Sequence, residues 1–272
     1  MLAIERKKHI MDFLRENKTL SVTELADRFQ SSKETIRRDL RDFEKQGLVR
    51  KTHGGAVLVE DGEKTAFMPA VTGPYFAELP IDIRRACHST EKEVICELAV
   101  KRLNSKDVIY IDNSSTTISL VKFIPPDLNI TVLTNSILVI TEAYKLNNPN
   151  LSIFCAPGFF NSNNLSLYGN QTVKMVEEFF PNKAFISCAA VMPDSRLADS
   201  SMYEIDTKRA FMGKSDKVFL LADADKFNQS APYLLSDMDL VDCIITDSRN
   251  PHFNWQRLET KSVEVIVGDE QP

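Results

Sequence analysis

The sequence predicts an α/β protein in which a small winged helix-turn-helix domain precedes a larger α/β domain with a mostly parallel sheet. Two observations predict it: capped amphipathic helices and a glycine-tipped hairpin fill the first sixty residues, and β-branched runs alternate with helical stretches beyond residue 80. A third is that residues rich in Pro, Gly and charge separate the two parts. We expect the winged helix-turn-helix at 1–60, a linker at 61–80 and the α/β domain at 81–272.

Charge is divided unevenly along the chain, whose formal net charge is −5. Residues 1–60 hold 13 Lys and Arg against 10 Asp and Glu, which leaves 20 against 28 for the rest of the 33 and 38. We therefore expect only the first part to meet a polyanion.

Cysteine spacing and hydropathy limit the classes of protein to which this sequence can belong. The five cysteines are widely spaced and set mostly among apolar neighbours, so we expect reduced core residues with no metal site, disulfide framework or cofactor. The chain becomes charged within its first residues, and no apolar run approaches membrane-spanning length. The expected compartment is the cytoplasm, with no membrane partner.

Two short helices are predicted at the start. Ile10, Met11, Phe13 and Leu14 give the first an apolar face, and it ends near Asn17. The second begins at a capping box in which Ser21 and Glu24 satisfy free backbone amides. Its buried face has helical spacing and consists of Val22, Leu25, Ala26 and Phe29.

The third helix, predicted from Lys33 to Gln46, has a cationic face. Ser31 and Ser32 cap its start, and Gly47 ends it. One stripe of this helix is apolar and consists of Ile36, Leu40 and Phe43. The opposite side is basic and consists of Arg37, Arg38, Arg41 and Lys45. Such a ridge fits the major groove of DNA, where Arg bonds guanine edges or phosphates.

A hairpin follows as the wing. Strand-like runs at 48–53 and 56–59 meet at Gly54-Gly55, which would bring basic residues beside the phosphate backbone. A three-helix bundle with a solvated charged face is the simpler alternative, but the caps, glycine stop, ridge and hairpin occur together in order, which favours DNA binding. The predicted DNA-contacting residues are Ser32, Lys33, Thr35, Arg37, Arg38, Arg41, Arg50, Lys51 and His53.

Seven strands and three helices are predicted in the larger domain. The strands are 108–111, 130–133, 151–154, 184–187, 218–221, 243–246 and 263–267. The helices are 136–144, 172–179 and 203–212. In a parallel sheet covered by helices, ligands bind at the carboxyl ends of the strands.

Polar residues gather at those strand ends. The run from Asp112 to Thr117 brings hydroxyls and free amides together, as in sites that hold phosphate without a metal, although plain helix capping is an alternative. Lys226 is the best candidate for a cation facing a phosphate or sugar oxygen; otherwise it is a solvated loop lysine. Glu204 and Lys208 are four apart on a helix and could form a surface ion pair unless that helix faces the site. Arg84 and His88 could reach the site or the linker.

These residues resemble the deoxyribose-operon repressor (DeoR) family over roughly residues 1–250. The first part of the likeness is Ser32 to Leu40 with Glu44, Gly47-Leu48 and His53 to Ala56. The rest consists of Arg84, His88, Lys92, 110–112, 134–136, Gly158, Gly169, 204–209, 222–223, 226–227 and 245–247. The family's usual Gly-Thr-Thr appears here as Ser114-Ser115-Thr116, and its glycine pair after the third strand as Pro157-Gly158.

The resemblance implies a bacterial-type regulator, often a repressor of a carbohydrate-use operon. It further implies a C-terminal domain similar in fold to sugar-phosphate isomerases, release from double-stranded operator DNA by a phosphorylated sugar, and a homo-oligomer, either dimer or tetramer. The expected effector-binding residues are Asp112, Asn113, Ser114, Ser115, Thr116, Thr134, Asn135, Ser136, Gly158, Glu204, Lys208, Asp223 and Lys226.

An enzyme is the alternative from another class. Asp112, Glu204, Asp223 and Lys226 could supply an acid, a base and a charge stabiliser for a sugar-phosphate isomerase with an added DNA-binding domain. The chain has no nucleophile elbow, Walker loop or His-Glu-x-x-His motif, and an isomerase needs no cationic helix, so we expect no enzymatic activity. An RNA-binding regulator is a third option, but the basic segment lacks aromatic stacking motifs.

Overall fold

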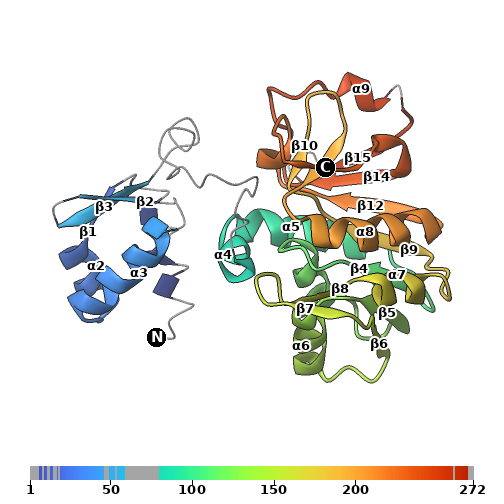
Figure 1. The fold of residues 1–272 in the computed structure, drawn as a ribbon, viewed down its shortest axis with the longest axis horizontal. Helices are drawn as coiled ribbons and strands as arrows, with labels where there is room; N and C mark the ends of the chain where they lie inside the picture. The colour runs from blue at the N-terminus through green and yellow to red at the C-terminus, as the bar shows by residue number, and fades with distance from the viewer. Residues whose placement is uncertain are drawn as a thin grey trace. The chain divides into compact units, whose positions relative to one another are not determined.

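The chain folds into two compact units, Met1–Cys87 and His88–Pro272, in the computed structural model (Figure 1). The residues described are 6–7, 9–10, 13–14, 17, 19–45, 49–52, 54–58, 80–259 and 261–268. The predicted linker, 61–80, therefore lies outside the described residues apart from Pro80. The predicted limits of the two domains stay a prediction.

The first unit consists of a helical layer and a small antiparallel sheet. Its elements are β1 (Thr19–Ser21), α2 (Val22–Arg28), α3 (Lys33–Lys45), β2 (Val49–Thr52), β3 (Gly55–Leu58) and α4 (Ile81–Ala86). The strand order is β1-β3-β2, and Thr52 pairs with Gly55 at the tip of the hairpin. The predicted helix-turn-helix and wing are thus present, and β1 is an additional strand that sequence reasoning missed.

Serine caps set where α2 and α3 begin. Ser21 Oγ accepts hydrogen bonds from the amides of Thr23 and Glu24, at 3.2 and 3.5 Å, and Ser32 Oγ accepts one from the amide of Thr35 at 3.1 Å. Between the helices Gln30 is left-handed, with φ of 46°, which allows the tight turn. The predicted stop at Gly47 lies outside the described residues.

The apolar stripes of these helices meet in one core. Its largest fully buried members are Ile10, Leu14, Leu25, Ile36, Leu40 and Phe43. Ile10 and Leu14 lie in helical backbone, as predicted for the first helix. Because all three helices turn their apolar stripes inward, the basic face of α3 is left for solvent.

The second unit is built on a seven-stranded sheet in which every pairing is parallel. The strand order is β15-β14-β12-β9-β4-β5-β6. The strands are β4 (Val108–Ile111), β5 (Ile130–Thr134), β6 (Leu151–Cys155), β9 (Lys183–Ile186), β12 (Lys217–Leu221), β14 (Cys243–Thr246) and β15 (Glu264–Val267). All seven predicted strands are present, so the predicted fold class is confirmed.

Helices and short strands surround this sheet. The helices are α5 (Ser89–Val100), α6 (Ile137–Leu146), α7 (Asn170–Val176), α8 (Met202–Lys214), α9 (Gln256–Glu259), η1 (Thr117–Phe123), η2 (Ala224–Lys226) and η3 (Met238–Leu240). The remaining strands are β7 (Phe159–Asn161), β8 (Ser166–Tyr168), β10 (Ala190–Val191), β11 (Leu197–Asp199) and β13 (Tyr233–Ser236). The three predicted helices correspond to α6, α7 and α8, whereas α5 and the short strands were not predicted.

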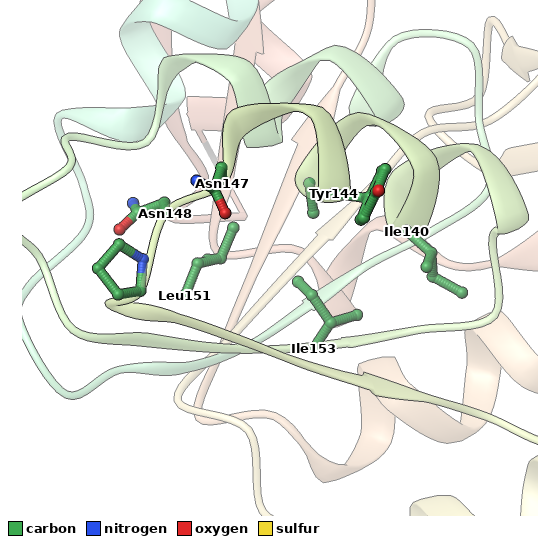
Figure 2. A pocket seen from close by; sticks show the side chains of 8 residues that line it. Ile140, Tyr144, Asn147, Asn148, Leu151 and Ile153 are labelled. Carbon is green, nitrogen blue, oxygen red and sulfur yellow. The ribbon is translucent and has the colours of Figure 1, made fainter.

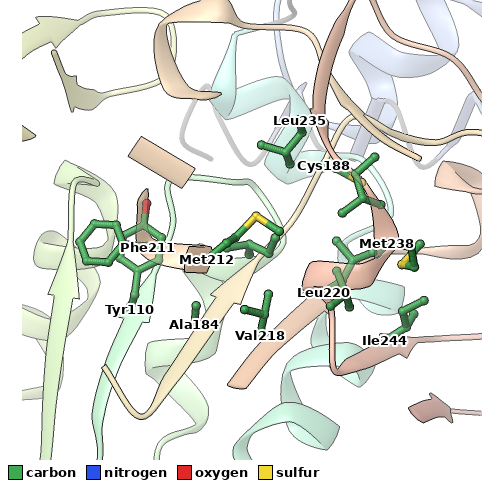
Figure 3. Close-up of a cluster of buried hydrophobic side chains, with 14 of the residues drawn as sticks. Tyr110, Ala184, Cys188, Phe211, Met212, Val218, Leu220, Leu235, Met238 and Ile244 are labelled. Carbon is green, nitrogen blue, oxygen red and sulfur yellow. The ribbon is translucent and has the colours of Figure 1, made fainter. Parts of the chain in front are cut away.

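A buried cluster joins the sheet to α7 and α8 (Figure 3). The rings of Tyr110 on β4 and Phe211 on α8 stack with centroids 3.6 Å apart. Ala184, Val218 and Leu220 continue this cluster along β9 and β12. Packing of this kind fixes α8 over the middle of the sheet, close to where the strands end.

Cysteine placement departs in part from the expectation. Cys96, Cys188 and Cys243 are buried, as expected of core residues, but Cys155 is exposed and Cys87 is half-buried. The expectation of a core cysteine is wrong for Cys155 because β6 is an edge strand of the sheet. Within the described residues, no helix is long and apolar enough to cross a membrane.

Gly55 is required by a close approach of two backbones. A Cβ built on Gly55 would lie 1.9 Å from the carbonyl oxygen of Leu20, on the neighbouring strand β1. The amide of Val22 also donates to the carbonyl oxygen of Gly54 at 2.8 Å, which holds β1 against the wing. Any side chain at Gly55 must therefore push the wing away from β1.

We expect Gly55→Ala to destabilise the first unit by about 1–3 kcal/mol, because the added methyl group overpacks a backbone contact. Amide hydrogen exchange followed by mass spectrometry should show faster exchange in residues 19–21 and 55–58. Gly213→Ala is the matched control, since a Cβ there meets no atom within 4 Å. Equal protection of β1 and β3 in Gly55→Ala and in the parent protein would contradict this packing.

Candidate functional site

The exposed face of α3 carries the predicted arginines. Arg37, Arg38 and Arg41 all lie on the solvent side of the helix. Arg41 forms an ion pair with Glu34, and an Arg37 guanidinium nitrogen lies 3.7 Å from the other oxygen of that carboxylate. The side chains of Arg37, Arg41 and Glu34 are 50–69% exposed, and ion pairs this exposed contribute little to the stability of a protein. The basic face therefore stays accessible to a polyanion.

The other predicted DNA contacts surround that face. Lys33 is exposed in the first turn of α3. Ser32 and Thr35 are joined by a 2.8 Å hydrogen bond between their hydroxyls and form the cap of the helix. Lys51 on β2 pairs with Glu44 of α3. Arg50 lies on the same strand, and His53 lies outside the described residues.

A buried ammonium group, that of Lys208, organises the carboxyl ends of the strands. Lys208 projects from α8, and its Nζ lies 2.8 Å from Asp199, 3.2 Å from Asp112 and 2.9 Å from the carbonyl oxygen of Ser187. It also donates to Ser114 Oγ at 3.1 Å. One cation thus joins the ends of β4, β9 and β11 beneath the helix.

Two carboxylates keep that cation charged. Burial disfavours the charged amine, but the adjacent carboxylates of Asp199 and Asp112 outweigh it and raise the pKa of Lys208 well above its usual value. Burial next to Asp112 likewise raises the pKa of Tyr110. Burial raises the pKa of the nearby Cys188 thiol to about 12, so this cysteine is a protonated core residue and not a nucleophile.

The Asp112 carboxylate accepts its hydrogen bonds from other groups of the protein. It accepts hydrogen bonds from the Ser114 amide at 3.0 Å, the Ser114 hydroxyl at 2.6 Å and the Ser187 amide at 3.1 Å. The Thr117 hydroxyl donates to it as well. Asp112 therefore shapes the loop that follows β4.

Glu204 anchors the β7–β8 hairpin to α8. Its carboxylate accepts hydrogen bonds from Ser166 at 2.7 Å, Asn164 at 2.9 Å and Asn161 at 3.5 Å. Glu204 and Lys208 are both 3% exposed, so the interpretation of the two as a surface ion pair is wrong. The physical reason is that this face of α8 is turned toward the sheet and covered.

The end of β5 is also internally bonded. Thr134 donates to the carbonyl oxygen of Ile111 at 2.7 Å, and Ser136 caps α6 through the amide of Val139. Asn135 accepts from the Tyr110 hydroxyl at 3.0 Å and donates to the carbonyl oxygen of Leu167. These residues hold the strand end and the hairpin together.

Four buried side-chain oxygens have no hydrogen-bond partner among the described residues at this end of the sheet. They belong to Asn113, Thr207 and Asp223, whose two carboxylate oxygens are both unpartnered. Asn113 follows β4, Asp223 follows β12 and Thr207 lies on α8 beside Lys208. Buried polar atoms are nearly always hydrogen-bonded, so these oxygens are available to a bound molecule or to water.

The remaining predicted residues differ in position. Ser115 and Thr116 are buried in the loop after β4, and Lys226 is half-exposed on η2, where no described residue bonds its amine. A Cβ at Gly158 would lie 2.5 Å from both Thr172 Oγ1 and the carbonyl oxygen of Tyr168, which gives this glycine a packing role.

His88 contacts the segment that carries Lys226. Its Nε2 lies 3.2 Å from a carboxylate oxygen of Asp225, one residue before Lys226.

Sequence reasoning missed Asp199, Ser187 and Thr207. Thr207 stands inside the 204–209 run that carried the resemblance, so its place beside Lys208 was a usable signal. Ser187 ends the predicted strand 184–187, so the rule that ligands bind at the carboxyl ends of strands could have found it. Asp199 reaches the site only through tertiary packing of β11 and stands in no pattern that predicts a ligand site.

We expect Lys208→Met to destabilise the second unit by about 3–5 kcal/mol, because it leaves two buried carboxylates without their cation. Urea unfolding at pH 7 measures this, with Lys214→Met as the control, since Lys214 is exposed on the same helix. Because the native pKa of Lys208 is raised, its stabilisation is complete below about pH 10.4 and is lost as pH rises through the native value. Equal urea midpoints for the two variants would contradict the bridging role.

Comparisons with known proteins agree with both units. The family model of the DeoR-like helix-turn-helix domain matches residues 6–61, and that of the DeoR C terminal sensor domain matches residues 87–248. The HTH-type transcriptional regulator IolR of Bacillus subtilis (strain 168) is 29% identical over 90% of this chain and 91% of its own. The glycerol-3-phosphate regulon repressor of Escherichia coli (strain K12) is 25% identical over 92% and 93%.

Another relative is similar over almost the whole chain. The uncharacterized HTH-type transcriptional regulator YulB of Bacillus subtilis (strain 168) is 30% identical over 98% of this chain and 97% of its own. A solved ribose 5 phosphate isomerase A from Neisseria gonorrhoeae covers 50% of this chain and 52% of its own, with 12% identity and a TM-score of 0.37, a likeness that says nothing of activity. The two matched domains and the end-to-end similarity to named regulators show that this chain belongs to the DeoR family of DNA-binding transcription regulators.

Proposed function

We propose that this regulator is a repressor that leaves its operator when a phosphorylated sugar binds at the carboxyl ends of β4, β9 and β12. The observation that carries this proposal is the set of unpartnered buried oxygens on Asn113, Thr207 and Asp223. A buried carboxylate without donors is costly, and a ligand with several hydroxyl groups supplies the missing donors. Sugars are ligands of that kind.

The phosphate has its own candidate partners. Lys226 offers an ammonium group on η2, and the loop after β4 offers the hydroxyls of Ser115 and Thr116 where η1 begins. Hydroxyls, backbone amides and one cation hold phosphate without a metal. Asp223 and Lys226 follow the same strand, so one ligand can engage both.

The internally bonded residues have a positioning role in this proposal. Asp112, Lys208, Glu204 and the 134–136 turn hold the strand ends in place, whereas the unpartnered groups await the ligand. The residues that hold the strand ends are therefore distinct from those that would bind the ligand, an arrangement that favours a sensor over an isomerase. Asp112 and Glu204, which could have served as acid or base, each accept three or more hydrogen bonds from the protein.

On DNA, we propose that two or more protomers place α3 in successive major grooves, with the wing on the backbone. Arg37, Arg38 and Arg41 then meet base edges or phosphates, and Lys51 with Arg50 and His53 meets phosphates. When the regulator occupies its operator, RNA polymerase cannot bind the same stretch of DNA. The phosphosugar must bind more tightly to a sensor conformation that does not fit the operator, since only differential affinity shifts an equilibrium.

We expect Arg38→Ala to weaken specific operator binding by about 1–3 kcal/mol if its guanidinium reads a base. Fluorescence anisotropy at physiological salt, with operator and scrambled duplexes, separates loss of specificity from loss of phosphate contacts. Lys217→Ala, an exposed lysine of the second unit, is the control and should bind as the parent does. Unchanged affinity of Arg38→Ala for the operator would remove this residue from the interface.

Asp223→Asn and Lys226→Ala should leave operator binding intact and raise the phosphosugar concentration needed for release about 10–100-fold, because each loses charge-assisted hydrogen bonds to the ligand. A panel of pentose, hexose and deoxy-sugar phosphates titrated into the protein–operator complex measures this. Asp206→Asn, exposed on α8, is the control. Release of both variants from the operator at the same phosphosugar concentration as the parent protein would contradict the proposed site.

The same panel tests the enzyme alternative. NMR spectra of each phosphosugar incubated with the purified protein should show no conversion, and turnover at enzyme-like rates would overturn the sensor assignment.

A further inference from the structure

An apolar hollow between α6 and β6 and a carboxylate on α3 both lack a role in the proposed function. The hollow, of about 490 Å³, is lined by Ile140, Tyr144, Ile153 and their neighbours (Figure 2). Its lining includes no charged residue, so it selects no ligand by charge. The carboxylate is that of Glu34, which lies on the basic face of α3 between arginines. Only the carboxylate has chemistry specific enough to indicate a partner.

Glu34 differs from the other acidic residues of α3, three of which tie this helix to another segment of the first unit. The three pairs are Arg6–Asp39 at 2.6 Å, Lys7–Asp42 at 2.8 Å and Lys51–Glu44. Among the described residues, Glu34 pairs only with Arg37 and Arg41 of α3 itself. The need to hold α3 in place therefore explains the other three carboxylates but not this one.

Helical spacing places Glu34 on the face of α3 that is open to a partner. Arg37, Arg38 and Arg41 follow it at i+3, i+4 and i+7, so all four side chains share one side of the helix. The Glu34 side chain is 69% exposed, and the cap at Ser32 fixes the backbone of its turn. In a helix-turn-helix the first residues of the recognition helix contact base edges. Glu34 therefore lies where a base is the expected partner.

Helix stability is the simpler explanation for an acid in this turn. A negative charge in the first turn interacts favourably with the helix dipole. Glu24 occupies the equivalent turn of α2 and is also exposed. Glu24 therefore provides a matched control, because it has the same charge and the same helical position on the neighbouring helix.

The chemistry of the major groove indicates which base a carboxylate can contact. An ionised carboxylate only accepts hydrogen bonds, and it is repelled by phosphates. Cytosine presents a single donor there, its N4 amino group, whereas adenine presents an acceptor beside its N6 donor. Guanine and thymine present acceptors. Cytosine is therefore the base that Glu34 fits best.

We propose that Glu34 is a specificity-determining residue, whose carboxylate accepts a hydrogen bond from N4 of one cytosine in each operator half-site. Arg37 and Arg41, which Glu34 holds in the free protein, then turn toward guanines of neighbouring base pairs, because the two acceptors of guanine match the arginine fork. On DNA without this cytosine, the carboxylate meets only acceptors and phosphates. This role rests on the proposed placement of α3 in the major groove.

Selection of bound sequences from a library of random DNA duplexes, with the full chain, measures the base preference at each position. The sites that the parent chain selects should contain a cytosine in each half-site that Glu34→Gln no longer requires. Adenine should be accepted there instead, because the glutamine amide bonds both N6 and N7 of adenine. In fluorescence anisotropy, replacement of that cytosine should weaken binding of the parent chain about tenfold and leave that of Glu34→Gln unchanged.

Glu24→Gln removes the same charge from α2 and should select the same sites as the parent chain. Far-ultraviolet circular dichroism checks that each variant is folded. The role of Glu34 is overturned if Glu34→Gln selects the parent's sites while Arg38→Ala weakens operator binding. If neither variant changes DNA binding, the proposed placement of α3 fails together with this role. A change confined to guanine positions would overturn the contact with cytosine, since Glu34 would then only position the arginines.

Discussion

The second unit depends on the ammonium group of Lys208, which is buried between the carboxylates of Asp112 and Asp199. A charged ammonium group in such a place must have its partners, because burial of an unpaired charge costs several kcal/mol, a large part of the stability of a typical domain. The partners come from the loop after β4 and from β11, while the cation comes from α8. The helix, the central strand and the small antiparallel sheet are therefore fixed relative to one another by one charge.

That constraint explains why some polar groups at the strand ends are satisfied and others are not. Asp112 and Asn135 have hydrogen bonds supplied by the protein, which fixes the strand ends around the proposed effector site. Among the described residues, Asn113 Oδ1 and both carboxylate oxygens of Asp223 have no hydrogen-bond partner. In the proposed effector site, unpaired acceptors held by a rigid frame would let hydrogen bonds supply much of the binding free energy, which would favour discrimination between sugars that differ in hydroxyl groups.

Most of the scaffold was predictable because its signals are local. The five inner parallel strands are largely buried on both faces and therefore appear as short β-branched runs. The serine caps of α2 and α3 stand immediately before their helices. β1 was not predicted because a strand of three residues shows no periodic pattern. α5 was not predicted because the buried Lys92 interrupts its apolar face. The site positions were predictable from the strand ends, but the partners were not: Asp199 pairs with Lys208 only because tertiary packing brings β11 beneath α8.

The exposed arginines of α3 obey the opposite physical rule from Lys208. Lys208 cannot exchange its partners without unfolding its surroundings, whereas Glu34 holds Arg37 and Arg41 in a solvated pair that a phosphate or a guanine can replace at small cost. A carboxylate within the basic face also weakens attraction to DNA in general, so a larger share of the affinity must come from contacts that depend on geometry. Burial thus makes one set of charges permanent, and exposure makes the other available to a partner.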